Sequence, residues 1–229
     1  MNAKSPRTMS AIAAALLIFA GSSYVLGWSN LLTVRAIEIT GAPNEQTKVN
    51  LTRSLDLAVG EKLARIDPRS ISARLSSNNW IQDSSVSRNW LTGKVEISIT
   101  SRVPVALYTA PGQPQVALDA SGKTFELPAE LPNSLPKVSA TSIESGLAAI
   151  KVFTEMPQEF RAGIERLSAA RTSNLLIYGV FSGREIRIIW GDGQDTELKI
   201  KVITALLEQP ENKSIRMIDV TAPHAPIVK

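Results

Sequence analysis

The chain has no cysteine and a single histidine among its 229 residues. The lack of cysteine excludes disulfides, thiolate nucleophiles, iron–sulfur clusters and cysteine-ligated zinc. The histidine, His224, lies between alanine and proline residues in a proline-broken tail. A mobile tail does not hold an imidazole in place against a serine, so a Ser-His-Asp triad is not expected. The sequence therefore predicts no cofactor, no metal site and no enzymatic activity.

The densest acidic patch, Gly191–Glu197, has a simpler explanation than a metal site. It lacks the spacing and the distal glutamate of a calcium-binding loop. Asp195 or Thr196 as a helix N-cap, with Glu197 in the first turn, explains these acids. The two glycines of this stretch do not form a phosphate loop, because the third glycine and the Lys-Ser/Thr pair are missing. The spacing of residues in the sequence does not exclude a catalytic pair of carboxylates from distant segments, as in glycosidases.

The positive charge of the chain is small and spread out. The formal net charge is +4, and Lys4 and Arg7 contribute half of it. A nucleic-acid-binding domain needs lysine and arginine clustered on one face. Trp80, Arg88 and Trp90 are residue types found on stacking surfaces, but their position in a strand pair beside a helix favours core packing or a partner-binding face. We expect no nucleic-acid partner and no small-molecule substrate.

The sequence has no acidic residue before Glu38, and the uncharged stretch Thr8–Val34 dominates its start. A helix rises about 1.5 Å per residue, so roughly 20 apolar residues cross the hydrocarbon core of a bilayer. Tyr24 and Trp28 stand at the far end of the apolar part, where aromatic rings settle at the level of the lipid headgroups. These features predict a transmembrane helix at residues 9–32.

The flanking charges predict the orientation of this helix. Lys4 and Arg7 precede it, and the positive-inside rule keeps residues 1–8 in the cytoplasm and places the remaining chain outside the cell membrane. The competing interpretation is a secretory signal peptide cleaved after Ala20. Ile18 is a poor residue for such a cleavage site, and apolar sequence continues beyond Ala20, so the retained anchor is favoured.

The exported part begins with a small α+β unit. Alternating apolar residues predict strands, and capping residues followed by apolar residues one turn apart predict helices. Both helices are expected on one face of the sheet. The predicted order is a strand at Val34–Gly41, a helix capped by Asn44, a helix starting at Asp67-Pro68, and two strands that contain Val86, Arg88 and Trp90 and Val95–Thr100.

A β-rich unit with two helices follows. Three prolines, Pro128, Pro132 and Pro136, predict an extended loop within it. The predicted elements are extended strands at 103–108, 116–118 and 123–125, a helix at 143–155, strands at 164–170, 175–181 and 184–190, a helix at 196–209, a last strand at Ile215–Val220, and a tail at 221–229.

Several segments, taken in order, resemble the FtsQ/DivIB family of bacterial cell-division proteins. The first, V-R-A-I-E-I-T-G (34–41) after a short basic tail and an apolar stretch, is similar to the entry of a POTRA domain. The family usually has proline where this chain has Leu91, and an acid where it has Ser101. The other matching segments are W-I-Q-D-S-S-V-S-R-N-W (80–90), V-E-I-S-I-T-S-R-V-P-V-A (95–106), V-A-L-D-A-S-G-K-T-F (116–125), R-E-I-R-I-I-W-G (184–191), K-I-K-V-I-T-A-L-L (199–207) and I-D-V (218–220).

The resemblance implies a fold and a role. The expected domains are a POTRA domain at 33–107 with β-α-α-β-β order, a β domain at 108–220 and a C-terminal tail at 221–229. The implied role is a single-pass scaffold at the division septum, without enzymatic activity, that helps to control septal peptidoglycan synthesis. The implied partners are FtsB/DivIC-like and FtsL-like coiled-coil proteins and other proteins of the division machinery.

The resemblance also implies where a partner binds, namely by adding a strand beside the last strand of the β domain. An open edge strand offers unpaired backbone groups to another strand. The alternative is that the strand is internal, with Ile218 and Val220 in the core. A secondary docking edge is expected at Val86 and Arg88. The residues predicted to bind the main partner are Ile215, Arg216, Met217, Ile218, Asp219, Val220 and Thr221.

Two other functions fit the sequence less well. One is a POTRA protein of an export or outer-membrane assembly machinery, but such proteins usually carry several POTRA units or a barrel, and this chain has one unit and no barrel-like series of strands. The other is a membrane-tethered cell-wall hydrolase, for which the exported segments offer no catalytic set that we can assemble.

Overall fold

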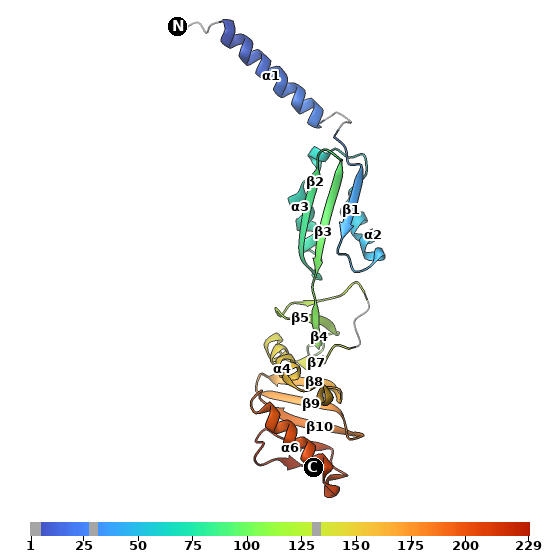
Figure 1. Cartoon of the computed structure of the whole chain (residues 1–229), viewed down its shortest axis with the longest axis vertical. Coiled ribbons are helices and arrows are strands. Elements are labelled where there is room, and N and C mark those ends of the chain that lie inside the picture. The colour runs from blue at the N-terminus through green and yellow to red at the C-terminus, as the bar shows by residue number, and fades with distance from the viewer. Residues whose placement is uncertain (1–5, 28–31, 130–133) are drawn as a thin grey trace. The chain divides into compact units, whose positions relative to one another are not determined.

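The computed structural model describes residues 6–27, 32–129 and 134–229 (Figure 1). The chain divides into two compact units, one that ends at Arg102 and one that begins at Val103. The predicted domain boundary, after residue 107, lies C-terminal to this division, inside the strand Pro104–Thr109 of the second unit. Residues 1–5 of the predicted tail, residues 28–31 of the predicted membrane helix, and Pro132 lie outside the described residues.

The apolar stretch near the N-terminus forms one helix, α1 (Pro6–Gly27). Its alanine and leucine residues are strong helix formers, which explains why the helix is continuous. Among the residues that the structure describes, however, no helix has both the length and the apolar character needed to cross a membrane. The predicted transmembrane span is thus not confirmed.

The N-terminal unit is built on a three-stranded sheet with the order β1-β3-β2. β1 (Ala36–Thr40) is parallel to β3 (Lys94–Ser101), and β2 (Ile81–Asn89) is antiparallel to it. Val95, Ile97 and Ile99 alternate along β3 and are buried on one face, which makes the central strand the core of the unit. The predicted alternation is therefore confirmed.

Two helices supply the rest of this core, as predicted. Asn44 caps α2 (Glu45–Ser54) by accepting a hydrogen bond from the amide of Thr47 at 2.7 Å. Asp67 caps α3 (Pro68–Ser76) in the same way. The order strand, helix, helix, strand, strand is confirmed, with an unpredicted 3₁₀ turn, η1 (Leu63–Arg65), between the helices.

The C-terminal unit is built on a nine-stranded mixed sheet with the order β12-β11-β10-β9-β8-β7-β4-β5-β6. The strands are β4 (Pro104–Thr109), β5 (Val116–Asp119), β6 (Thr124–Phe125), β7 (Lys137–Ala140), β8 (Ile164–Arg171), β9 (Asn174–Phe181), β10 (Arg184–Gly191), β11 (Met217–Asp219) and β12 (Ile227–Val228). Ser182 and Gly183, both with positive φ, form the tight turn between β9 and β10.

Helices cover one face of this sheet (Figure 1). They are α4 (Ile143–Glu155), the short α5 (Gln158–Arg161) and α6 (Thr196–Glu208). Every second residue of the central strands faces them, so Ile177, Ile188 and Trp190 are fully buried beneath Ile203 of α6. The two long helices were predicted, and the limits of α4 agree with the prediction.

Two short strands occur where none was predicted. β7 lies just after the proline-rich loop and pairs in parallel with both β4 and β8. β12 lies in the segment that was predicted to be a tail, and it pairs antiparallel with β11. Both are too short to show a periodic pattern, and only pairing with neighbours distant in sequence makes them strands.

Candidate partner-binding site

The strand predicted as the docking edge lies inside the sheet. β11 is hydrogen-bonded to β10 on one side and to β12 on the other. Ile215, Ile218 and Val220 are 7%, 0% and 0% exposed and belong to the core of the unit. The prediction that Ile215–Val220 forms an open edge is therefore wrong, and the alternative, in which Ile218 and Val220 are core residues, is confirmed.

The other residues of this predicted site face away from the core. Met217 and Asp219 are half-buried on the opposite face of β11, while Arg216 and Thr221 are exposed. One oxygen of the Asp219 carboxylate accepts hydrogen bonds from the amide and the hydroxyl of Thr221, at 2.9 and 2.7 Å. This turn ends β11 and directs the following residues back along the edge of the sheet.

β12 is held by a defined pattern of backbone hydrogen bonds. Met217 and Lys229 exchange both of their N–H···O bonds, at 2.9 and 3.0 Å. On the other side of β11, the carbonyl of Arg216 and the amide of Val220 bond to β10. Backbone groups of odd-numbered residues in β11 therefore face β12, and those of even-numbered residues face β10.

The free edge of this side of the sheet belongs to β12, and it is short. Val228 lies opposite Ile218, at a position between the bonded pairs, so its N–H and C=O point away from β11. Pro226 has the same orientation as Val228, and its missing N–H removes a donor from the free edge without weakening the pairing with β11. The side chain of Ile227 is 54% exposed beside this edge.

The sequence contained a weak signal for β12. Ile227 and Val228 are β-branched, which favours strands, but the preceding prolines favour a broken tail. The position of Pro226 decides between the two interpretations, because a proline on the outward side of an edge strand is tolerated. That position depends on the register with β11, which a single sequence does not give.

The predicted secondary edge is an edge strand, since β2 pairs only with β3 among the described strands. Val86 and Arg88 lie opposite Ile97 and Val95 of β3, and so they share the face that carries the helices. Val86 is half-buried there. The edge thus exposes its backbone, while the two predicted side chains point toward the core face.

Arg88 has an internal structural task. Its guanidinium donates hydrogen bonds to the carbonyls of Leu63 and Ile66, at 3.1 and 2.5 Å. It also lies over the ring of Trp90, 5.1 Å from the ring centroid. The side chain therefore fixes the η1 turn to β2, and a partner at this edge would meet the backbone of β2 before it meets this guanidinium.

The acidic patch near α6 is organised around a buried lysine. Lys199 is 1% exposed, and its Nζ donates to the carbonyl and the carboxylate of Asp192, at 3.0 and 3.2 Å. Hydrogen bonds from the Gln194 amide and from Lys199 lower the pKa of Asp192. Asp195 occupies the N-cap position of α6, as predicted, but its side chain makes no capping bond.

These groups form no catalytic arrangement that we can identify. The described part of the chain contains no group of three or more His, Cys, Asp or Glu side chains placed to hold a metal ion. The Asp192 carboxylate is committed to Lys199 and to the backbone, and His224 is exposed in the segment before β12.

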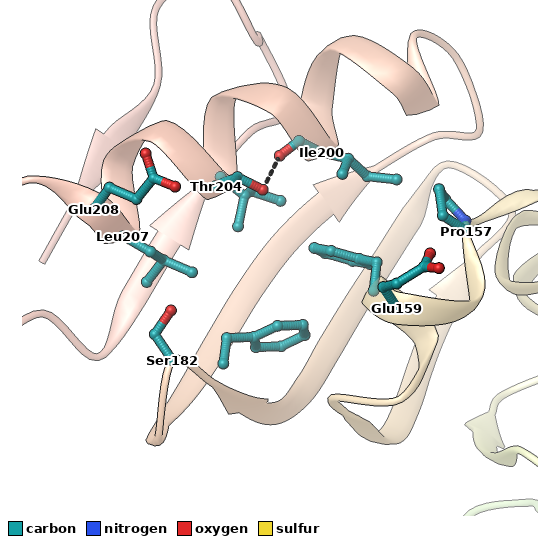
Figure 2. A pocket seen from close by; sticks show the side chains of 10 residues that line it. Pro157, Glu159, Ser182, Ile200, Thr204, Leu207 and Glu208 are labelled. Atoms are coloured by element: carbon teal, nitrogen blue, oxygen red, sulfur yellow. Dashed lines mark hydrogen bonds between the residues drawn. The ribbon is translucent and has the colours of Figure 1, made fainter.

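An apolar depression lies between α5, α6 and the β9–β10 turn (Figure 2). It has a volume of about 290 Å³. Figure 2 shows Glu208 at one end and Glu159 at the other, and the hydroxyl of Thr204 bonds to the carbonyl of Ile200 at 3.0 Å. This lining suits an apolar side chain better than bond cleavage. Its apolar residues are Phe160, Phe181, Ile200, Ile203 and Leu207.

Two family profiles match consecutive parts of the chain. The profile described as "POTRA domain, FtsQ-type" matches residues 32–102, and the profile described as "Cell division protein FtsQ/DivIB, C-terminal" matches residues 107–221. The first match covers the β1–β3 unit, and the second covers most of the nine-stranded sheet but ends before β12.

Several relatives named "Cell division protein FtsQ" match this chain, some over most of their length and others over a part of it. The protein from Streptomyces coelicolor is 26% identical over 237 residues, which cover 96% of this chain and 87% of that protein. The protein from Mycobacteroides abscessus is 27% identical over 218 residues, which cover 93% of this chain and 66% of that protein. A shorter match, 36% identical over 96 residues, covers 42% of this chain and 34% of the protein from Rhodothermus marinus.

Proposed function

The chain belongs to the FtsQ/DivIB family of bacterial cell-division proteins, and from that premise we propose that it is a non-enzymatic scaffold of the division machinery. In this role it binds an FtsB/DivIC-like coiled-coil protein, together with an FtsL-like protein and other division proteins, and helps to control septal peptidoglycan synthesis. Binding occurs by β-strand addition in the C-terminal unit.

The free edge of β12 is the observation that carries this proposal. The outward N–H and C=O of Val228 are available for pairing with a partner strand. Ile227 offers an exposed apolar side chain on one face of the edge, while Val228 packs against the core on the other. Among the seven residues predicted for the site, Arg216 and Thr221 are exposed, but they lie at the ends of β11, which β12 separates from such a strand.

A pair of proline substitutions tests the edge. Val228→Pro removes an outward donor from the free edge but leaves the pairing of β12 with β11, so we expect a folded protein that has lost partner binding. Ile227→Pro removes an inward donor at the neighbouring position, so we expect β12 itself to detach. The measurement is energy transfer between the labelled full chain and the labelled FtsB/DivIC-like protein from the same genome, both incorporated into the same vesicles.

The control for this experiment is the thermal stability of each variant. A Val228→Pro protein that melts with the wild-type protein and still binds the partner with unchanged affinity would contradict strand addition at β12. If that variant loses binding only because it is unfolded, the melting curve reveals it.

We further propose that α1 attaches the protein to the cell membrane at the division septum, with the N-terminus in the cytoplasm and both units outside. The side chains of Leu16, Leu17 and Phe19 on α1 are 63%, 74% and 73% exposed. Apolar side chains this exposed on one helix need a lipid or protein surface to cover them. Sedimentation of membranes from the host measures this, and a wild-type chain found in the soluble fraction would refute the attachment.

The secondary docking edge at Val86 and Arg88 stays a prediction, with β2 as its location. Val86→Asp places a charge at a half-buried position beside the exposed backbone of β2. We expect weaker septal recruitment with a modest loss of stability. Fluorescence microscopy measures this recruitment. A folded Val86→Asp protein that is recruited normally to the septum would argue against this edge.

A further inference from the structure

The turn between β2 and β3 presents apolar side chains to solvent. Leu91 is 92% exposed and Trp90 is 38% exposed. The turn is rigid, because the Asn89 side chain accepts hydrogen bonds from the amides of Leu91 and Thr92, both at 3.1 Å. The amide of Gly93 also bonds to the carbonyl of Asn89, at 2.9 Å. A preorganised turn that holds a leucine and a tryptophan outward is suited to an apolar or interfacial surface.

Cationic residues surround this turn. The amide of Arg35 donates to the carbonyl of Gly93 at 2.7 Å, so the exposed Arg35 lies directly beside the turn. Arg88 lies over Trp90 and binds the carbonyls of the η1 turn, which brings the exposed Arg65 to the same end of the unit.

The cations at this end of the unit slightly outnumber the acids. Lys62 pairs with Thr33 through an isolated β-bridge and adds a further cation. Glu61 is the acid next to Lys62 in the sequence. Lys94, at the start of β3, forms ion pairs with Glu38 and Glu96. With Arg35, Lys62, Arg65, Arg88 and Lys94 against Glu38, Glu61, Asp67 and Glu96, these five cations and four acids leave this end of the unit with a net charge of +1.

The chain also tethers this end of the unit to α1. Thr33 follows Gly27, the last residue of α1, by six positions. An extended chain spans at most about 3.6 Å per residue, so Thr33 lies within roughly 20 Å of the end of α1 whatever path the linking residues take. If α1 is attached to the membrane, the β2–β3 turn lies near the lipid headgroups.

We propose that the β2–β3 turn docks on the surface of an anionic phospholipid bilayer. Trp90 and Leu91 enter the headgroup region, and Arg35 and Arg65 contact lipid phosphates. Tryptophan favours the membrane interface, and clustered cations are attracted to anionic headgroups. This inference rests on the proposed attachment of α1. An acidic protein would satisfy the cations, but the tether places a membrane, rather than a protein, within reach.

A single fluorescent probe tests the contact. The chain has no cysteine, so Leu91→Cys can be labelled alone with a polarity-sensitive dye in the full chain. The matched control is Gln82→Cys, an exposed position at the opposite end of β2. The chains are incorporated into vesicles of phosphatidylcholine with phosphatidylglycerol, and into vesicles of phosphatidylcholine alone. We expect a blue-shifted emission, and quenching by shallow spin-labelled lipid, at position 91 and not at position 82.

Removing the positive charges separates the electrostatic contribution to docking from the apolar contribution. In Arg35→Gln/Arg65→Gln, we expect the quenching at position 91 to fall to roughly half or less, and added salt should lower it in the wild-type chain. Equal quenching in vesicles without phosphatidylglycerol would overturn the anionic part of the proposal.

Flotation of the vesicles keeps two failures apart. A chain that does not float with the vesicles refutes the attachment of α1, on which the inference rests. A chain that floats while the dye at position 91 reports water, as at position 82, leaves the attachment intact and overturns the docking of the turn.

Discussion

Lys199 shows how one buried residue organises a loop whose acids resemble a metal site in the sequence. Its Nζ binds the carbonyl and the carboxylate of Asp192, and it lies 5.5 Å from the ring centroid of Trp190. A lysine that is almost fully buried needs such partners, because an unpaired charge in the core is costly. The acids between β10 and α6 are therefore explained by folding.

This pairing predicts a dependence of stability on pH. The pKa of Asp192 is lowered in the folded protein, first by the hydrogen bond from Gln194 and then by Lys199. The stabilisation is therefore present above the unfolded pKa of about 3.9 and is lost as the pH falls through the folded pKa. We expect Asp192→Asn to lower the free energy of unfolding by about 1 kcal/mol at neutral pH, since the carboxylate is half-exposed.

The measurement is urea unfolding of both proteins over a series of pH values. The difference between them should shrink toward zero in acid. A difference that stays constant down to about pH 3 would show that the lost stability does not come from the ionised carboxylate.

Gly41 and Gly60 form a matched pair for a prediction about backbone strain. Both have positive φ, 81° and 96°. A Cβ on Gly60 meets nothing within 4 Å, whereas a Cβ on Gly41 would overlap the carbonyl oxygen of Ile99. We expect Gly60→Ala to cost about 1–2 kcal/mol from φ alone, and Gly41→Ala to cost about 1–3 kcal/mol more from the overlap. Chemical denaturation measures both, and equal costs would contradict the overlap.

At the scale of elements, β11 and β12 have the two roles, core strand and edge strand, that the sequence predicted for one strand. β11 supplies core residues and a ladder on both sides, while β12 supplies the exposed edge. Because β11 is hydrogen-bonded to a strand on each side, it cannot accept a partner strand unless β12 leaves first.

This division predicts opposite effects for two glutamate substitutions. Ile218→Glu buries a charge where the side chain is 0% exposed, and we expect the C-terminal unit to unfold, with a loss of about 4 kcal/mol or more. Ile227→Glu changes an exposed residue of the edge, so we expect stability within about 0.5 kcal/mol of wild type and weaker partner binding. Circular dichroism and a binding titration test the pair. A folded Ile218→Glu protein would contradict the burial of β11.

Elements with strong local signals were predictable from the sequence. Asn44 and Asp67 marked the starts of α2 and α3, and the apolar residues of α4 gave both of its ends. β7 and β12 were missed, since each depends on pairing with strands distant in sequence. The error at the candidate site has the same origin. Alternation along Ile215–Val220 does not distinguish an edge strand from an internal one, and the pairing with β12 is what makes β11 internal.

At the scale of the whole molecule, the two sheets have separate cores. The three-stranded sheet and the nine-stranded sheet share no strand among the described residues, and the two compact units meet in sequence between Arg102 and Val103. Domains with their own cores generally fold as separate units. A single unfolding free energy for the chain would then have no clear meaning.

We therefore predict that residues 33–102 and residues 103–229 fold as separate fragments. Each should melt cooperatively, within a few degrees of the corresponding transition in the whole chain, in differential scanning calorimetry. A fragment that lacks a cooperative transition would show that its core needs the other unit.

The shortness of β12 has a consequence for the lifetime of a complex. Val228 offers two outward backbone groups, and at about 1 kcal/mol for each hydrogen bond the edge supplies roughly 2 kcal/mol. Even millimolar affinity requires about 4 kcal/mol. A partner held only there would dissociate rapidly. Confinement of both proteins to one membrane would raise their effective concentration and make a weak edge sufficient. Assembly at this edge would then be reversible, with exchange governed by local crowding rather than by tight intrinsic affinity.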